Sequence, residues 1–113
     1  MLLDIETLEG DKWDKEESID VYIGEFFENN ESLHGKDEDY IFTYYPHAFI
    51  NALIILDKVK VSPNADVIAA AEHDQIYFEV DKFKFATLST NDVLELIRAG
   101  VNFCTSDGFY KYV

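Results

Sequence analysis

The chain has 113 residues, of which 48% are hydrophobic and 15% aromatic, so it is not a disordered acidic tail and fits one folded domain over residues 1–113. Its net charge of −14 disfavours direct binding to nucleic-acid phosphates or to a membrane with anionic lipids. Cys104 is the only cysteine, and the start lacks the basic and apolar parts of a signal peptide, so we expect a cytoplasmic protein.

The first third of the chain predicts a strand, a helix and a loop. Residues 2–8 alternate loosely between apolar and polar and fit a strand. Apolar residues then recur at helical spacing over about 14–30, and Asp14 with a glutamate three residues on resembles a capping box. Residues 31–39 contain a glycine and no apolar period, so we expect a solvated loop there.

The middle of the chain is rich in aromatic and aliphatic residues. Residues 40–45 are partly alternating and predict a strand that ends at Pro46. Residues 47–56 are apolar almost all round and predict a buried helix, although so short a run also fits a central strand. Val59 and Val61 alternate with lysines, which predicts another short strand.

Three apolar-rich runs follow, at 67–72, 76–80 and 83–88. The polar breaks between them are only two or three residues long, which is typical of antiparallel connections. We therefore expect three neighbouring strands.

The end of the chain predicts a capped helix and a hairpin. Ser89 or Thr90 can cap a helix that stops just before Gly100, because glycine is favoured directly after a helix end. Residues 101–113 contain a Thr-Ser-Asp-Gly turn between two apolar runs and fit a hairpin. The whole pattern predicts an α+β domain with an antiparallel sheet of about four to six strands, chiefly from residues 59–88 and 101–113, and two or three helices.

Sequence motifs of catalysis and metal binding are missing. There is no glycine-rich phosphate loop, nucleophile elbow or His-Glu-x-x-His helix. Cys104 could act as a nucleophile only if His34, His47 or His73 met it in the fold, and free cysteine more often packs as a small buried hydrophobe. The acidic runs do not fit a calcium loop, and the histidines are too dispersed for a zinc site. We expect no enzyme activity, no cofactor and no metal.

The acidic residues are concentrated at one end of the chain. Residues 1–39 hold fourteen of the 23 carboxylates and three lysines, a charge of −11, whereas residues 40–113 carry −3. On a helical wheel, most acids of the predicted helix lie opposite its apolar stripe, beside Gly24, whose missing side chain could let a partner approach; Tyr22 is expected in the core. The ordinary wet face of a helix explains part of this pattern but not the local imbalance.

We therefore predict that this acidic region binds a protein with a basic surface. Ten carboxylates are the candidate partner-binding residues: Asp14, Glu16, Glu17, Asp20, Glu25, Glu28, Glu31, Asp37, Glu38 and Asp39. Nearby aromatic residues could anchor the contact, as tyrosine and tryptophan often do: Trp13, Tyr22, Tyr40, Tyr44 and Tyr45.

Carboxylates displayed in this way can take the place of nucleic-acid phosphates in a basic groove and are steered there by long-range charge. No family motif is recognised. In size, acidity and aromatic content alone, the chain resembles the small inhibitors by which phages and mobile elements block restriction or CRISPR enzymes through DNA mimicry. This resemblance implies a non-enzymatic inhibitor of a nucleic-acid-binding protein. The alternatives are an immunity protein that neutralises a cognate nuclease toxin, and an acidic interaction domain without mimicry.

Overall fold

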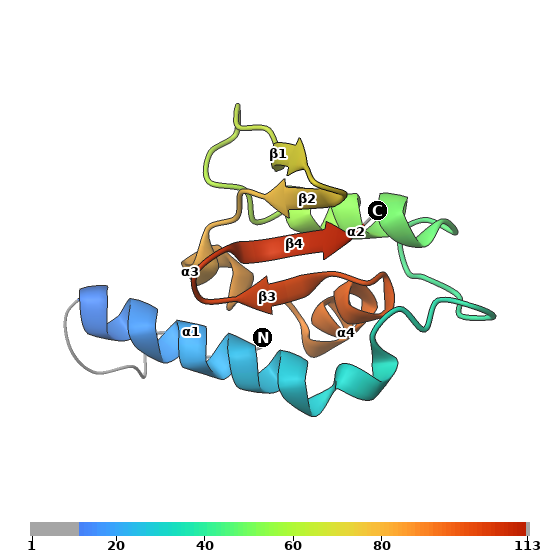
Figure 1. Ribbon diagram of the computed structural model, residues 1–113, viewed down its shortest axis with the longest axis horizontal. Coiled ribbons are helices and arrows are strands. Elements are labelled where there is room, and N and C mark those ends of the chain that lie inside the picture. Colours follow the sequence, from blue (N-terminus) through green and yellow to red (C-terminus); the bar gives the residue numbers. More distant parts are fainter. Residues whose placement is uncertain (1–11, 113) are drawn as a thin grey trace.

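A four-stranded antiparallel sheet and four α-helices make up the part of the chain that the computed structural model describes, residues 12–112. In chain order the elements are α1 (Lys12–Asn29), the 3₁₀ helix η2 (Glu31–Leu33), α2 (Ala48–Asp57), β1 (Ile68–Glu72), β2 (Gln75–Phe78), α3 (Lys82–Phe85), α4 (Thr90–Arg98), β3 (Asn102–Cys104) and β4 (Gly108–Tyr112). The strand order is β1-β2-β4-β3 (Figure 1). The predicted α+β class is confirmed, with one helix more than expected. The strand expected over 2–8 lies outside the described residues.

The register of β2 and β4 decides which face of the sheet is buried. Phe78 and Phe109 are cross-strand partners, and both are buried. The ring centroid of Phe49 in α2 lies 6.5 Å from that of Phe78, and the centroid of Phe85 in α3 lies 4.4 Å from that of Phe109. Because side chains alternate along a strand, the neighbouring Tyr77 belongs to the other face. Helices α2 and α3 therefore cover one face of the sheet.

Helix α1 lies along the β3 edge of the sheet (Figure 1). Ile19 and Ile23 of its apolar stripe are fully buried, and the ring centroid of Phe27 lies 6.1 Å from that of Phe103 in β3. A free edge strand offers backbone N–H and C=O groups for further pairing, so α1 closes this edge. The helix predicted over 14–30 is confirmed, but its predicted cap is wrong, because α1 already includes Lys12 and Asp14 lies in its first turn.

The predicted helix ends and hairpins towards the C-terminus are also confirmed. The Ser89 side chain accepts a hydrogen bond from the Asp92 N–H at 3.1 Å, and Gly100 follows α4 with φ +89°. The two residues between β1 and β2, His73 and Asp74, both have positive φ, as a tight hairpin turn of the I′ type requires. The helix expected over 47–56 is present as α2, but it is buried on one face only, because Ile50 and Ile54 are exposed.

The strand predicted over 83–88 is wrong, because this segment begins with α3. The Asp81 side chain accepts hydrogen bonds from the N–H groups of Phe83 and Lys84, which caps the helix. Phe85 and Leu88 are buried in the core. A short continuous apolar run does not distinguish a buried strand from a buried helical turn.

The strands predicted over 40–45 and at 59–61 are wrong as well. In the first segment, the N–H groups of residues 43, 44 and 45 donate to the side chains of Glu95 and Asn51 instead of to a neighbouring strand. In the second, only Lys60 forms a β-bridge, and this bridge is isolated. Backbone hydrogen bonds to distant side chains thus replace a β-ladder in the middle of the chain.

Candidate functional site

Six of the ten predicted partner-binding residues lie on α1, and most of them face away from the sheet. Glu17, Glu25 and Glu28 are exposed on the side of the helix opposite the buried stripe of Ile19 and Ile23. Residues eight apart on a helix are separated by about 12 Å, so Glu17 and Glu25 lie two turns from each other. The helical period therefore places these carboxylates in one row.

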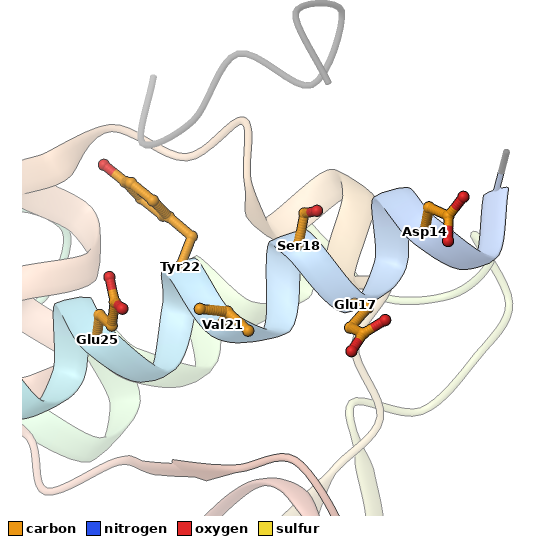
Figure 2. A pocket seen from close by; sticks show the side chains of 6 residues that line it. All are labelled: Asp14, Glu17, Ser18, Val21, Tyr22 and Glu25. Atoms are coloured by element: carbon orange, nitrogen blue, oxygen red, sulfur yellow. The ribbon is translucent and has the colours of Figure 1, made fainter. Parts of the chain in front are cut away.

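A shallow hollow of about 470 Å³ lies on this outer side of α1. Six residues line it: Asp14, Glu17, Ser18, Val21, Tyr22 and Glu25, which we call the α1 surface. Figure 2 shows Val21 on the helix between the carboxylates of Glu17 and Glu25, with Asp14 one turn further along. Val21 is 54% exposed and Tyr22 37% exposed, so the surface has an apolar and aromatic centre with acids around it.

One expectation about α1 is wrong. Tyr22 was expected in the core, but it lies at the edge of the apolar stripe and its side chain belongs to the α1 surface. Gly24 lies beside Glu28 and Glu31 at a separate hollow next to β3, where an added Cβ atom would be at an ordinary contact distance of 4.0 Å from the ring of Phe103. That the missing side chain at Gly24 lets a partner approach stays a prediction.

Two of the predicted carboxylates on α1 lie on its flank, towards α3. Asp20 forms an ion pair with Lys82 of α3, with 2.8 Å between Oδ1 and Nζ, and the side chains are only 17% and 23% exposed. Glu16 is partly buried and lines a small cavity with Lys82. The charge of Asp20 is thus largely compensated within the protein.

The remaining four predicted residues follow α1 at its C-terminal end. Glu31 opens η2, and the residues of the 37–39 run are exposed in the loop after it. This loop is fixed to α4: the Gly35 N–H donates to the carbonyl of Ile97, and the Arg98 guanidinium donates to that of Lys36, both at 3.1 Å. The structure thus brings Asp14, Glu17 and Glu25 together at one hollow and Glu28 and Glu31 at a second one beside β3. The acids at 37–39 lie in the loop beyond the helix end (Figure 1).

A buried carboxylate that the sequence did not single out lies between α4 and the 40–45 segment. Glu95 is fully buried. Its Oε1 accepts hydrogen bonds from the Thr43 N–H and the Asn51 amide, each at 2.9 Å, and its Oε2 accepts from the Thr43 hydroxyl and the Asn91 amide. Burial alone raises the pKa of Glu95, but these hydrogen bonds outweigh it, so the pKa lies below the usual glutamate value.

A second cluster lies one turn earlier on α4. The Tyr44 hydroxyl donates to Asp92 at 2.8 Å and accepts from the Lys58 ammonium at 2.7 Å. Burial lowers the pKa of Lys58, but the hydrogen bond to Tyr44 and the charge of Asp92 outweigh it, so the pKa is raised and the amine stays protonated. A protonated lysine cannot act as a nucleophile or base.

Both clusters hold separate segments of the fold together. Each polar group in them is bonded to another group of the protein, so Glu95 has no free lone pair aimed at a cavity. Tyr40 and Tyr44, predicted as interface anchors, instead donate to Glu95 and Asp92. One sequence signal could have revealed the hydrogen bond between Asn51 and Glu95, because each of these polar residues interrupts an otherwise apolar run.

The other candidates for chemistry are dispersed. Cys104 forms hydrogen bonds with Ser106 and Asp107, and none joins it to a histidine within residues 12–112. No group of three or more histidine, cysteine or carboxylate side chains in the described part of the chain could hold a metal ion. No helix in that range is both long and apolar enough to cross a membrane.

No protein-family model, curated protein or solved structure matches this chain.

Proposed function

We propose that this protein is a non-enzymatic inhibitor whose α1 surface occupies a basic groove through which another protein binds nucleic acid. The observation that supports the proposal is the composition of that surface: carboxylates around the exposed side chains of Val21 and Tyr22. Within residues 12–112, no lysine, arginine or histidine forms an ion pair with Glu17 or Glu25. Their charge is available to a partner.

The arrangement suits a groove that binds phosphates. One DNA strand carries a phosphate about every 3.4 Å, so the roughly 12 Å between Glu17 and Glu25 corresponds to three to four phosphate steps. Close registry is not needed, because the summed charge of the protein steers a basic partner towards it. A tyrosine at the centre of the contact then supplies apolar area and a hydroxyl group, the combination found in interface hot spots.

The resemblance in composition to phage and mobile-element inhibitors makes restriction and CRISPR enzymes the first class of partner to test. Such enzymes hold nucleic acid in positively charged channels. An inhibitor of this kind acts by stoichiometric competition and carries out no reaction.

The test compares two triple variants with equal net charge. In the first, Glu17, Glu25 and Glu28 are changed to lysine, and in the second, three exposed carboxylates elsewhere, Asp74, Glu79 and Asp107, are changed to lysine. Each variant changes the net charge from −14 to −8, so any difference between them reports position rather than total charge. The immobilised proteins capture partners from a lysate of the source cells, with and without duplex DNA as competitor.

We expect the unmodified protein and the second variant to capture the same partner, DNA to displace it, and the first variant to lose it. Capture should also weaken as salt rises, because salt screens exposed charges. Capture that the α1 reversals leave unchanged would sink the proposal. Loss on reversal without displacement by DNA would reject mimicry, and very tight capture of a single nuclease would favour the immunity-protein alternative.

A further inference from the structure

The edge strand β1 lacks most of the features that keep such strands from pairing with other chains. It pairs with β2 only, and no other described element lies along its outer side (Figure 1). Natural sheets protect a free edge with lysine, proline or a bulge. β1 has the sequence Ile-Ala-Ala-Ala-Glu, all exposed, and its one irregularity lies between Ile68 and Ala70. The regular run from Ala70 to Glu72 is therefore open to a further strand.

An apolar groove of about 670 Å³ borders this edge on the helix side of the sheet. Its apolar lining comes from one face of α2 and from the start of β1: Ile50, Leu53, Ile54, Val67 and Ile68. Ile50, Ile54 and Ile68 are 39%, 36% and 41% exposed. Exposed hydrophobic residues are ordinary singly, but a contiguous group beside an open edge marks an interaction surface.

The register of β1 indicates which side chains a further strand would need. Ile68 pairs with the buried Phe78 and so belongs to the helix side, whereas Ala70 pairs with Tyr77 on the opposite face. An added strand places alternate side chains on these two faces. One set would enter the apolar groove. The other set would lie on the opposite face and extend over the small side chain of Ala70 towards the ring of Tyr77 and the carboxylate of Glu72. A long cationic side chain fits best there.

The charge around β1 favours a cationic occupant over a second copy of this chain. Residues 57–79 carry five carboxylates against two lysines, one of which, Lys60, is paired with Asp57 at 3.0 Å. Besides burial, the charges of Asp107 and Glu72 raise the pKa of Tyr77, which reports a negative potential on the open face of the sheet. Two copies would bring these acids and their net charges of −14 together, whereas lysine or arginine side chains compensate them.

We propose that β1 and the groove beside it bind an extended segment of another protein, in which apolar residues alternate with lysine or arginine, as an added strand of the sheet. Backbone hydrogen bonds to Ala70–Glu72 give such a contact its affinity, and the groove with Glu72 gives it specificity. This site is separate from the α1 surface and does not depend on the function proposed for it.

The probe is a synthetic eight-residue peptide of alternating valine and lysine, acetylated and amidated at its ends. It is titrated into the full-length protein while the backbone amide signals are followed by NMR. Two control peptides have the same side chains, one with N-methyl groups on every valine and the other on every lysine. We expect shift changes within 66–72 and along the Ile50–Ile54 face of α2. One methylated peptide should bind at least tenfold more weakly, because it cannot donate to β1, and the other should retain affinity.

Two variants of the protein add a matched comparison. Ala70→Lys places a positive charge on the edge, whereas Ser32→Lys makes the same charge change in η2, where Ser32 is exposed. We expect the first to raise the Kd of the unmethylated peptide at least tenfold and the second to change it less than twofold. The dispersion of the amide spectrum shows whether each variant is folded.

Equal affinity for all three peptides overturns the proposal, since the contact would then not involve backbone pairing. Shift changes confined to α1 that disappear in the Glu17, Glu25 and Glu28 reversal variant overturn it too, since the peptide would only be attracted to that surface. A concentration-dependent doubling of mass in sedimentation that Ala70→Lys abolishes would assign the edge to a second copy instead.

Discussion

Glu95 connects α4 to two segments that lie 44 and 52 residues earlier in the sequence. Its carboxylate accepts hydrogen bonds from Thr43 in the irregular 40–45 segment, from Asn51 in α2 and from Asn91 in α4. A buried charge is costly unless its hydrogen-bonding capacity is filled, and here it is filled. The conformation of the 40–45 segment therefore depends in part on a side chain about fifty residues away.

Replacing Glu95 with glutamine should reduce the free energy of unfolding by about 2 to 4 kcal/mol. The glutamine amide keeps the shape of the side chain, but its NH₂ group meets donors from Thr43 or Asn91 and leaves them without an acceptor. Denaturant unfolding measures the difference. The control is Glu79→Gln at an exposed glutamate, which should change stability by less than about 0.5 kcal/mol. A loss no larger than that of the control would show that the network contributes no net stability.

The stabilities of wild type and of the Glu95→Gln variant should also depend differently on pH. The pKa of Glu95 in the folded state lies below its value of about 4.3 in an unfolded chain, so the ionised carboxylate stabilises the fold fully above that pH. This contribution is lost as the pH falls through the lower, folded pKa. The stability gap between wild type and Glu95→Gln should therefore narrow in acid, and unfolding curves at several pH values measure it. A gap that stays constant down to the acid unfolding of the protein would contradict the lowered pKa.

Among the secondary-structure elements, those with local signals were predicted and those set by distant contacts were not. Ser89 and Gly100 bound α4 through a cap and a left-handed backbone, both readable from sequence. The apolar run at 83–88 suits either a strand or a helix. Asp81, which caps α3 and so makes the segment helical, resembles part of a polar break in the sequence. Within 40–45 itself, no residue signals that its N–H groups would bond to Glu95 and Asn51.

The residues of the candidate site likewise divide into those placed by a local sequence pattern and those placed by contacts between elements. The helical period alone predicts that Glu17, Glu25 and Glu28 lie on the outer side of α1, where the structure has them. It could not place Lys82 beside Asp20, because α3 was expected to be a strand. Ion pairs between elements depend on topology, and a wheel drawn for one helix contains no information about it.

The short helix α3 should depend strongly on its cap. Asp81→Ala removes the acceptor for the N–H groups of Phe83 and Lys84 and should reduce stability by about 1 to 2 kcal/mol. Asp81→Asn is the matched variant, since asparagine caps helices as well as aspartate does, and it should cost only a few tenths of a kcal/mol. Thermal or denaturant unfolding measures both. Equal losses would mean that the charge of Asp81 matters and its capping does not.

At the scale of the whole molecule, the net charge of −14 opposes folding, because it is held within a radius of gyration of 13.6 Å. The net charge thus affects both the stability of the protein and its attraction for a partner. The carboxylates proposed to attract a partner are also the ones that repel each other in its absence. A bound cationic partner would relieve this repulsion and stabilise the protein by mass action.

Added salt should therefore raise the melting temperature. The screening length falls from about 30 Å in 0.01 M salt to about 8 Å in 0.15 M salt, so repulsion across the molecule is largely removed over this range. A gain of about 1 kcal/mol corresponds to a rise of about 4 °C for a domain of this size. Calorimetry in sodium chloride measures the effect, and either triple variant, with a charge of −8, should show a smaller rise. An equal rise in all three proteins would point to a salt effect unrelated to net charge.

The position of α1 along β3 also limits how this protein can assemble. A sheet with two free edges can add copies without end, as fibrils do, because each added copy leaves a new edge exposed. Within residues 12–112, one edge is closed by a helix of the same chain, and β1 is the edge that remains open. Any pairing through β1, whether with a partner strand or with another copy, uses the free edge of this described sheet and ends its growth at that single step.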